Sequence, residues 1–223
     1  MRHARTESSR PGGEDNVHDV VPIEPNAALA SLPGDPEAPL VTRADTTTAD
    51  VVVLVDEDGT PTGTWPRRTV HSDTTPLHLA ISVYLLDPAG RLLLTRRALG
   101  KRTWPGVWTN SCCGHLRPGE SGEQAARRHL RTELGVTDAV LTCVLPDFRY
   151  RAQDAAGVWE NEICPVFLAR PVGDVELTVD PDEAMEIAWA DWSAVRTAMT
   201  LAPFAFSPWS REQVAIMAVP ESR

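Results

Sequence analysis

The 223-residue sequence has no apolar run long enough to cross a membrane, and its start has no apolar segment typical of signal peptides. These absences predict a cytoplasmic protein without a membrane partner. Basic residues are also few, since 21 Lys and Arg against 31 Asp and Glu leave a net charge of -10. This balance argues against a general binder of nucleic acids or anionic membranes, but it leaves room for a local basic pocket.

Cysteine is rare, and none of the four cysteines forms a CxxC pair. The spacing therefore excludes the disulfide framework of a small secreted domain. For Cys143 and Cys164 we expect small, buried apolar side chains within strands.

Residues 1–50 lack aromatic side chains and hydrophobic periodicity, and they contain six prolines. Four basic and nine acidic residues place half of the net charge in this segment. Such a composition predicts a disordered acidic tail. Residues 51–223 then form a single domain, long enough for a sizeable core.

Within that domain, strands and helices follow one another without strict alternation. Strands are predicted at 51–55, at 79–86 and 91–95 as a hairpin across the turn 87–90, and at 140–145, 158–169 and 185–189. Helices are predicted at 120–134, ended by Gly135, from Asp191 to about Met199, and from Ser207 to about Val219 with Pro208 in the first turn. This order indicates an α/β (α+β) fold, a mixed-sheet sandwich with flanking helices.

The helix at 120–134 carries the strongest local motif. Its frame is Gly114, five residues, Glu120, seven residues, Arg128, and then Glu133 and Gly135. This frame resembles the Nudix signature, a loop and helix that hold a metal–diphosphate unit.

Two positions depart from that signature. The family expects glutamates where this chain has His129 and Thr132, and those glutamates collect the cations that activate water for hydrolysis. The remaining carboxylate, Glu133, is predicted to hold one Mg²⁺. The motif thus indicates a protein that grips a diphosphate without cutting it.

A second set of polar residues suggests a metal site. Glu160 and Glu162 are two positions apart in a predicted strand and therefore project to one face, where two carboxylates repel unless a cation joins them. Three histidines outside the tail segment, His71, His78 and His115, offer imidazole ligands. Three imidazoles and two carboxylates suit Mg²⁺, Mn²⁺ or another transition metal.

Several longer motifs, in order from about residue 51 to Trp209, carry a specific resemblance. They are HSD and LHL within 71–79, TRRAL at 95–99, WPGVWTNSCCGH at 104–115, PDFRYR at 146–151, ENEICPVF at 160–167 and FSPW at 206–209. Together they resemble the type 1 isopentenyl-diphosphate isomerases. The resemblance implies that a double bond moves by protonation of an alkene and loss of a second proton, with water excluded.

The resemblance also implies roles for particular residues. Cys113 matches the catalytic cysteine and Glu162 the opposing acid or base. Tyr150 matches a tyrosine that hydrogen-bonds the catalytic carboxylate, and Trp209 an aromatic face that stabilises the developing cation. Because neighbours in an extended segment point opposite ways, Cys112 is expected to face the core. The alternatives for Cys112 are a vicinal disulfide or an exchange of roles with Cys113.

Further matches concern the bound groups. Arg67, Arg97 and Lys101, the single lysine of the chain, match basic positions that hold the diphosphate. Arg67 stands where the family commonly has lysine, and the two residues bind phosphate differently. The metal set implied is His71, His78, His115, Glu160 and Glu162 for one divalent metal (Mn²⁺, Mg²⁺ or Zn²⁺), with Glu133 for a diphosphate-associated Mg²⁺.

Two other functions stay open at this point. One is a Nudix hydrolase of a nucleotide or another diphosphate, against which His129 and Thr132 count. The other is a binding protein built on an enzyme domain that has lost its activity, against which the complete Cys113, Glu162 and histidine set counts.

Overall fold

The computed structural model describes residues 20–22, 50–174 and 176–218. Its strands are β1 (Val20–Pro22), β2 (Val51–Val55), β3 (Pro61–Pro66), β4 (His78–Leu85), β5 (Leu92–Arg97), β6 (Trp108–Thr109), β7 (Cys112–His115), β8 (Ala139–Leu145), β9 (Arg149–Gln153), β10 (Trp159–Ile163), β11 (Val166–Pro171) and β12 (Ala184–Ala190). The helices are α1 (Gly122–Leu134), α2 (Trp192–Leu201) and α3 (Pro208–Ile216), with short 3-10 turns η2 (Arg67–Thr69) and η3 (Pro203–Ala205). Within the described ranges, no helix combines the length and apolar character of a membrane span.

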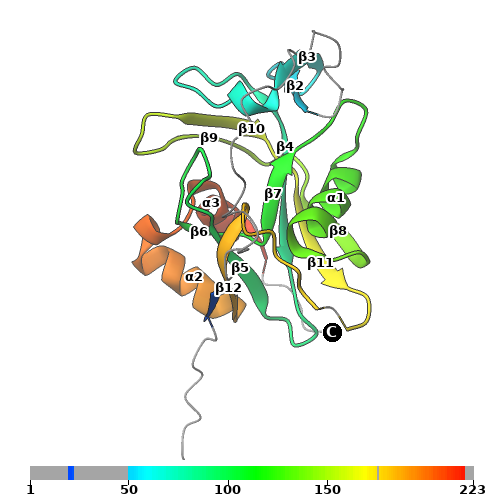
Figure 1. Cartoon of the computed structure of the whole chain (residues 1–223), viewed down its shortest axis with the longest axis vertical. Coiled ribbons are helices and arrows are strands. Elements are labelled where there is room, and N and C mark those ends of the chain that lie inside the picture. Colours follow the sequence, from blue (N-terminus) through cyan, green and yellow to red (C-terminus); the bar gives the residue numbers. More distant parts are fainter. Residues whose placement is uncertain (1–19, 23–49, 175, 219–223) are drawn as a thin grey trace, which may run out of the picture.

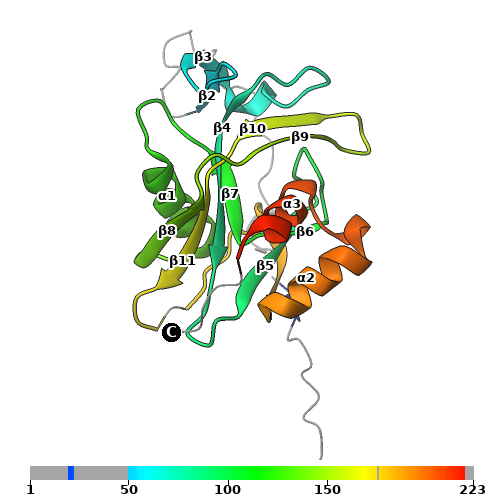
Figure 2. The same cartoon turned by 180° about the vertical axis from the view of Figure 1, so that it is seen from behind.

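The strands form two sheets between α1 on one side and α2 and α3 on the other (Figures 1 and 2). The smaller sheet has the order β1-β12-β5-β6. In the larger sheet, β4 runs parallel to β10 and β11 and antiparallel to β2 and β7. This confirms the predicted mixed-sheet sandwich with flanking helices.

Strand β4 is buried on both faces and separates two hydrophobic clusters. Ile81 and Val83 pack in the cluster that includes Leu130 of α1. Tyr84, on the alternate face, packs in the cluster that includes Trp192 of α2. Because side chains alternate along a strand, β4 fixes the two helical layers on opposite sides.

Helix α1 is bounded by two clear capping features. Ser121 caps its start in a reciprocal capping box with Gln124. Gly135 ends it in the left-handed region, with φ 74°, and its N–H bonds the carbonyl of Arg131. The predicted stop is confirmed, whereas the predicted start at Glu120 is two residues early because Ser121 is the cap.

The predicted hairpin is wrong beyond its turn. Asp87 and Arg91 close the turn by a backbone hydrogen bond, and Leu86 still pairs with Leu92. The strands then separate, β4 joining the larger sheet and β5 pairing with β12 and β6. Along their edges, β4 pairs with β10 and β11 and β5 pairs with β12, all of them distant in sequence. A local sequence pattern does not reveal such pairing.

The predicted strand 158–169 is split in two. Pro165 has no N–H to donate to a strand ladder, and the strand is interrupted there. The part before it is β10 and the part after it is β11. Glu162 is level with His78, and Val166 with Ser82, so the two halves follow one another along β4. This break leaves β10 as a separate strand at the end of β4 where the histidines lie.

Other expectations have mixed outcomes. The strand at 51–55 is confirmed, while those at 140–145 and 185–189 and the helix from Asp191 are extended by one or two residues. The last helix ends at Ile216, with Pro208 in its first turn as predicted. Cys164 is buried, but Cys143 is exposed, because its stretch of β8 faces outward. Of the predicted tail segment, the structure describes β1, which pairs with β12, and Asp50, while the rest of 1–49 lies outside the described residues.

Candidate active site

A cavity of about 720 Å³ opens between the loop that joins β5 to β6, the start of β10, the end of β7 and helix α1. Ten of the twelve residues that the sequence assigns to catalysis, the diphosphate or a metal line it: Arg67, His71, Arg97, Lys101, Cys113, His115, Glu133, Tyr150, Glu160 and Glu162. The other two, His78 and Trp209, are buried behind its wall. The chain thus gathers residues from 67 to 162 around one space.

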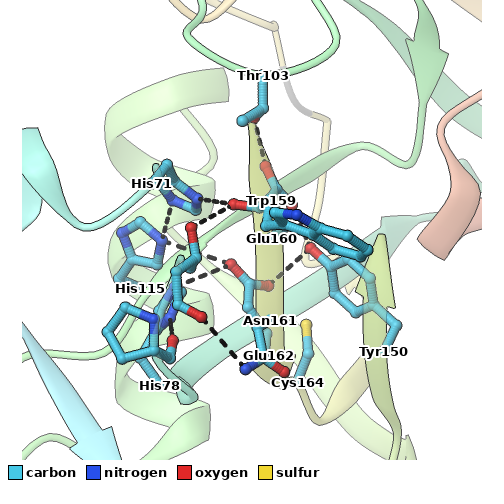
Figure 3. Close-up of polar contacts among 12 residues, drawn as sticks. His71, His78, Thr103, His115, Tyr150, Trp159, Glu160, Asn161, Glu162 and Cys164 are labelled. Carbon is cyan, nitrogen blue, oxygen red and sulfur yellow. Dashed lines mark hydrogen bonds and ion pairs between the residues drawn. The ribbon is translucent and has the colours of Figure 1, made fainter. Parts of the chain in front are cut away.

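Four of these residues present ligand atoms to a common point. One nitrogen or oxygen atom from each of His71, His78, His115 and Glu162 lies within 4.8 Å of those of the other three. Pairing of β4 with β7 and β10 brings three of them together, and His71 comes from the loop after η2 (Figure 3). Among the described residues, Glu160 is not a member of this group.

The orientation of His78 fits a bound cation. Its Nδ1 lies 2.8 Å from the carbonyl oxygen of Pro76, which makes Nδ1 the protonated nitrogen and leaves a lone pair on Nε2. That Nε2 is fully buried and has no hydrogen-bond partner in the described structure, and Glu162 Oε1 is 3.4 Å away. A divalent cation would satisfy this unpaired nitrogen and the adjacent carboxylate together.

Burial and charge set the protonation of this group. Burial lowers the pKa of His71 to about 4 and also lowers the pKa of His115. Burial acts the same way on His78, but the close approach and negative charge of Glu162 outweigh it and raise the pKa of His78. For Glu162, burial is outweighed by the close approach of His115 and His78, which holds its pKa well below the usual range. At neutral pH the group therefore contains an ionised carboxylate beside two neutral imidazoles.

Glu160 and Glu162 share the hydroxyl of Tyr150. That hydroxyl makes a short hydrogen bond with Glu160 and lies 2.9 Å from Glu162 Oε2. Both carboxylates are 6% exposed, so they share one buried face of β10 as their spacing predicted. The second oxygen of Glu160 accepts a short hydrogen bond from Thr103 (Figure 3).

Cys113 lies in β7 and contributes its thiol to the cavity. Burial raises the pKa of this thiol to about 12, although the charge of Arg97 opposes the rise. The pKa is thus higher than the ordinary thiol value assumed from sequence, and the thiol is neutral at pH 7. Cys112 points the opposite way into the core beside α1, as expected, and the two cysteines are free rather than joined in a vicinal disulfide.

Trp209 lies behind the cavity, packed against aromatic and basic side chains. Its ring is 5.6 Å from Tyr150 and 5.4 Å from Trp104, and the guanidinium of Arg97 lies 5.3 Å from its centre. Its Nε1 donates to Asn110 Oδ1 at 2.9 Å, which fixes the ring plane. Arg97 therefore stands between this aromatic face and the open space.

The three basic residues predicted to bind the diphosphate make ion pairs or hydrogen bonds within the protein. Arg67 pairs with Asp50 at 2.9 Å, and Lys101 Nζ lies 2.5 Å from a Glu183 oxygen. Arg97 donates to the carbonyl of Thr103. A bound diphosphate would exchange with carboxylates at two of the three positions.

Glu133, on the inner face of α1, lies beside His129, one of the two positions that depart from the Nudix signature. His129 Nδ1 is 2.5 Å from its Oε1. Burial raises the pKa of Glu133, and the hydrogen bond and charge of His129 counteract the rise. An imidazole thus fills space beside Glu133 where the signature expects another carboxylate.

Sequence reasoning missed several residues that line the cavity or hold its walls. Thr103 contacts Glu160, Glu183 pairs with Lys101, and Arg102 donates to the carbonyl of His71 at 2.7 Å. Arg128, which the Nudix frame did include, bonds Glu120 and the carbonyl of His115. The first three gave no signal beyond their place near the quoted motifs, since their partners are far away in sequence.

Comparisons with known proteins agree on the family. The NUDIX domain matches residues 76–212. An isopentenyl-diphosphate Delta-isomerase of Frankia alni is 58% identical over 74% of this chain and 84% of its own length. The chain belongs to the isopentenyl-diphosphate Delta-isomerase family of Nudix proteins. A second member, from Mycolicibacterium vanbaalenii, is 54% identical over 77% of this chain and 93% of its own length.

Solved structures support the fold. A protein of Deinococcus radiodurans superimposes with a TM-score of 0.58 over 74% of this chain and 97% of its own. At 18% identity, this similarity concerns the fold alone. Membership in the isomerase family therefore depends on the close relatives and the motif-bearing segments.

Proposed function

We propose that this protein is an isopentenyl-diphosphate Delta-isomerase, which interconverts isopentenyl and dimethylallyl diphosphate for isoprenoid precursor synthesis in the cytoplasm. The observation that carries the proposal is that the thiol of Cys113 and the carboxylate of Glu162 lie on the wall of one cavity. A double-bond shift adds one proton to the terminal alkene carbon and removes one from the methylene on the diphosphate side. It requires one protonated and one unprotonated group, and the raised pKa of the Cys113 thiol and the lowered pKa of the Glu162 carboxyl support this division of roles.

Cys113 and Glu162 exchange roles with the direction of the reaction. In one direction the thiol gives its proton and the carboxylate accepts one, and the reverse reaction restores the starting state. Tyr150 orients Glu162 through its hydroxyl at 2.9 Å. Trp209, whose ring packs against Tyr150 and the Arg97 guanidinium, is the aromatic group proposed to stabilise the positive charge that develops on the middle carbon.

The substrate is anchored by its charged end. In this proposal Arg67, Arg97 and Lys101 bind the diphosphate, and Glu133 would hold a Mg²⁺ ion that supplies further positive charge to it. Anchoring at the mouth keeps the five-carbon chain against Cys113 and Glu162 and excludes the water that would trap a cation.

We further propose that His71, His78, His115 and Glu162, together with Glu160, would hold a divalent metal. The donor set of imidazoles and carboxylates fits Mn²⁺, Mg²⁺ or Zn²⁺. When bound, the ion supplies positive charge that keeps Glu162 oriented and tunes its affinity for a proton. A chelator is expected to remove activity reversibly, and full activity in metal-free protein would contradict this assignment.

The function is tested with isopentenyl diphosphate in deuterated water containing Mg²⁺. We expect NMR to show deuterium entering the carbon chain as the dimethylallyl isomer accumulates. A parallel assay for released phosphate separates this function from the Nudix hydrolase alternative. Steady phosphate release without alkene migration would overturn the proposal.

A further inference from the structure

We propose that Thr103 is a positioning residue that directs the single proton of the Tyr150 hydroxyl toward Glu162. The inference concerns how the acid–base pair is prepared, and it rests on the isomerase function proposed above. The observation behind it is a continuous line of contacts, Thr103 to Glu160 to Tyr150 to Glu162, along the buried wall of the cavity (Figure 3).

Along this line of contacts, the Tyr150 hydroxyl has fewer protons to donate than it has carboxylates within reach. The Tyr150 hydroxyl has one proton and lies within hydrogen-bond distance of two carboxylates, Glu160 and Glu162. Both carboxylates are nearly buried, so each needs donors from the protein. One phenolic proton does not satisfy both acceptors.

Thr103 relieves that shortage on the Glu160 side. Its hydroxyl donates to Glu160 Oε1, while Tyr150 contacts the other oxygen of the same carboxylate. Glu160 then has a donor of its own, and the Tyr150 proton is available to Glu162. Without the Thr103 hydroxyl, Tyr150 would be the one side-chain donor to Glu160 among the described residues, and Glu162 would lose its share of that proton.

The backbone of Thr103 is fixed by contacts that do not involve its hydroxyl proton. Its carbonyl accepts from Arg97 Nε at 3.1 Å and from Nη2 at 2.9 Å. The next residue, Trp104, has φ 42° and packs edge-on against Trp209. A side chain of the same shape without the hydroxyl is therefore expected to keep the loop in place.

The hydroxyl also links the anchoring and reacting ends of the site. Its oxygen lies 3.3 Å from Arg97 Nη2, so it receives from the guanidinium while it donates to Glu160. Thr103 is 3% exposed, which shields both contacts from water. Thr103 thus joins a predicted diphosphate residue to the carboxylates of the reacting end.

The chain offers a direct probe of this proton, because it contains two tyrosines. Labelling with tyrosine enriched in ¹³C at the ring carbon that bears the hydroxyl gives one signal for Tyr150 and one for Tyr84. Tyr84 donates to Gln213 and serves as an internal reference. In chelated protein, we expect Thr103→Val to move the Tyr150 signal and leave that of Tyr84 in place, and Thr103→Ser to restore it.

Kinetics of the metal-loaded enzyme supply the second readout. We expect Thr103→Val to lower kcat about tenfold, the effect of one lost hydrogen bond in the transition state, with KM for the diphosphate nearly unchanged. Thr103→Ser should recover most of kcat. Thr197→Val is the control, because this exposed hydroxyl bonds the carbonyl of Ser193 within α2, away from the cavity.

Each outcome bears on the proposal. An unmoved Tyr150 signal, an unchanged kcat, or a loss that Thr103→Ser does not rescue would overturn it. If Thr103→Val does not fold, Thr103→Ala takes its place in both measurements. Failure of the isomerase function would appear as an inactive wild-type enzyme, while the NMR comparison would still test the hydrogen-bond line by itself.

Discussion

At the residue scale, three histidines with the same side chain have different affinities for a proton. At His71 and His115 the effect of burial exceeds that of the neighbouring carboxylates, so their pKa values fall. At His78 the effect of Glu162 exceeds that of burial, so its pKa rises. Neutral imidazoles are the form that binds metals, because the lone pair is then free. The fold thus prepares two ligands at neutral pH and keeps a carboxylate charged beside them.

The assigned acid–base roles predict the effect of two substitutions. Cys113→Ala and Glu162→Gln each remove a proton-transfer group, so turnover should fall by about 10²- to 10⁴-fold while the diphosphate still binds. Isomerisation rates and equilibrium binding of the substrate measure the two effects. Cys112→Ala is the matched control, since its side chain faces the core. Retained turnover in either active-site variant would refute the roles.

His71 predicts how the metal-free protein responds to acid. Its pKa is about 4 in the folded protein and near 6.5 when unfolded, so the unfolded chain binds the proton first as pH falls. The contribution to stability is complete above pH 6.5 and disappears progressively as pH falls toward 4, a loss on the order of 3 kcal/mol. Urea unfolding of chelated protein across this range should show a smaller loss for His71→Asn. Equal pH dependence in both proteins would contradict the assignment.

At the element scale, the site depends on how closely β7 approaches α1. Gly114 in β7 faces the His129 ring of α1, and a Cβ built on this glycine would lie 2.1 Å from the ring carbon Cε1. The glycine of the Nudix frame is thus needed for space, and its φ is not in the positive range. This contact holds His129 against Glu133.

We expect Gly114→Ala to force the His129 ring aside and to destabilise the protein by about 1–3 kcal/mol, as overpacking does. The double variant Gly114→Ala with His129→Ala removes the clashing ring and should recover part of that loss, which a double-mutant cycle measures. Gly63→Ala is the control, because nothing lies within 4 Å of its added Cβ. Additive effects of the two substitutions would show that the ring and the glycine do not interact.

At the scale of the whole molecule, residues 51–218 contain every group assigned to the site. The segment before them contributes one described element, the three-residue strand β1 on the edge of β12. None of the site residues lies on β1 or β12. The single domain predicted from residue 51 should therefore carry the activity alone.

A chain that begins at Asp50, which keeps the ion pair with Arg67, tests this expectation. We expect kcat and KM close to those of the full chain, with the midpoint of thermal unfolding lowered by no more than about 4 °C for the loss of a short edge strand. A chain lacking only residues 1–19 keeps β1 and serves as the control. A large loss of turnover in the shorter chain alone would show that the first 49 residues support the site.

Much of the local structure was predictable because its causes are local. The strand alternation that places Glu160 and Glu162 on one face and the stop at Gly135 follow from neighbouring residues. Pro165 was equally visible in the sequence, but the split that it causes was not predicted. The hairpin error arose because β4 and β5 pair with strands from distant parts of the chain.

The sequence by itself determined the family, because the motifs that hold Cys113, Glu162 and the histidines are contiguous and specific. Only the tertiary structure decided how these groups are supported. The contact of Thr103 with Glu160 joins residues 57 positions apart, and that of Lys101 with Glu183 residues 82 apart. Such pairs carry no local pattern, since their energy arises only when packing removes both partners from water.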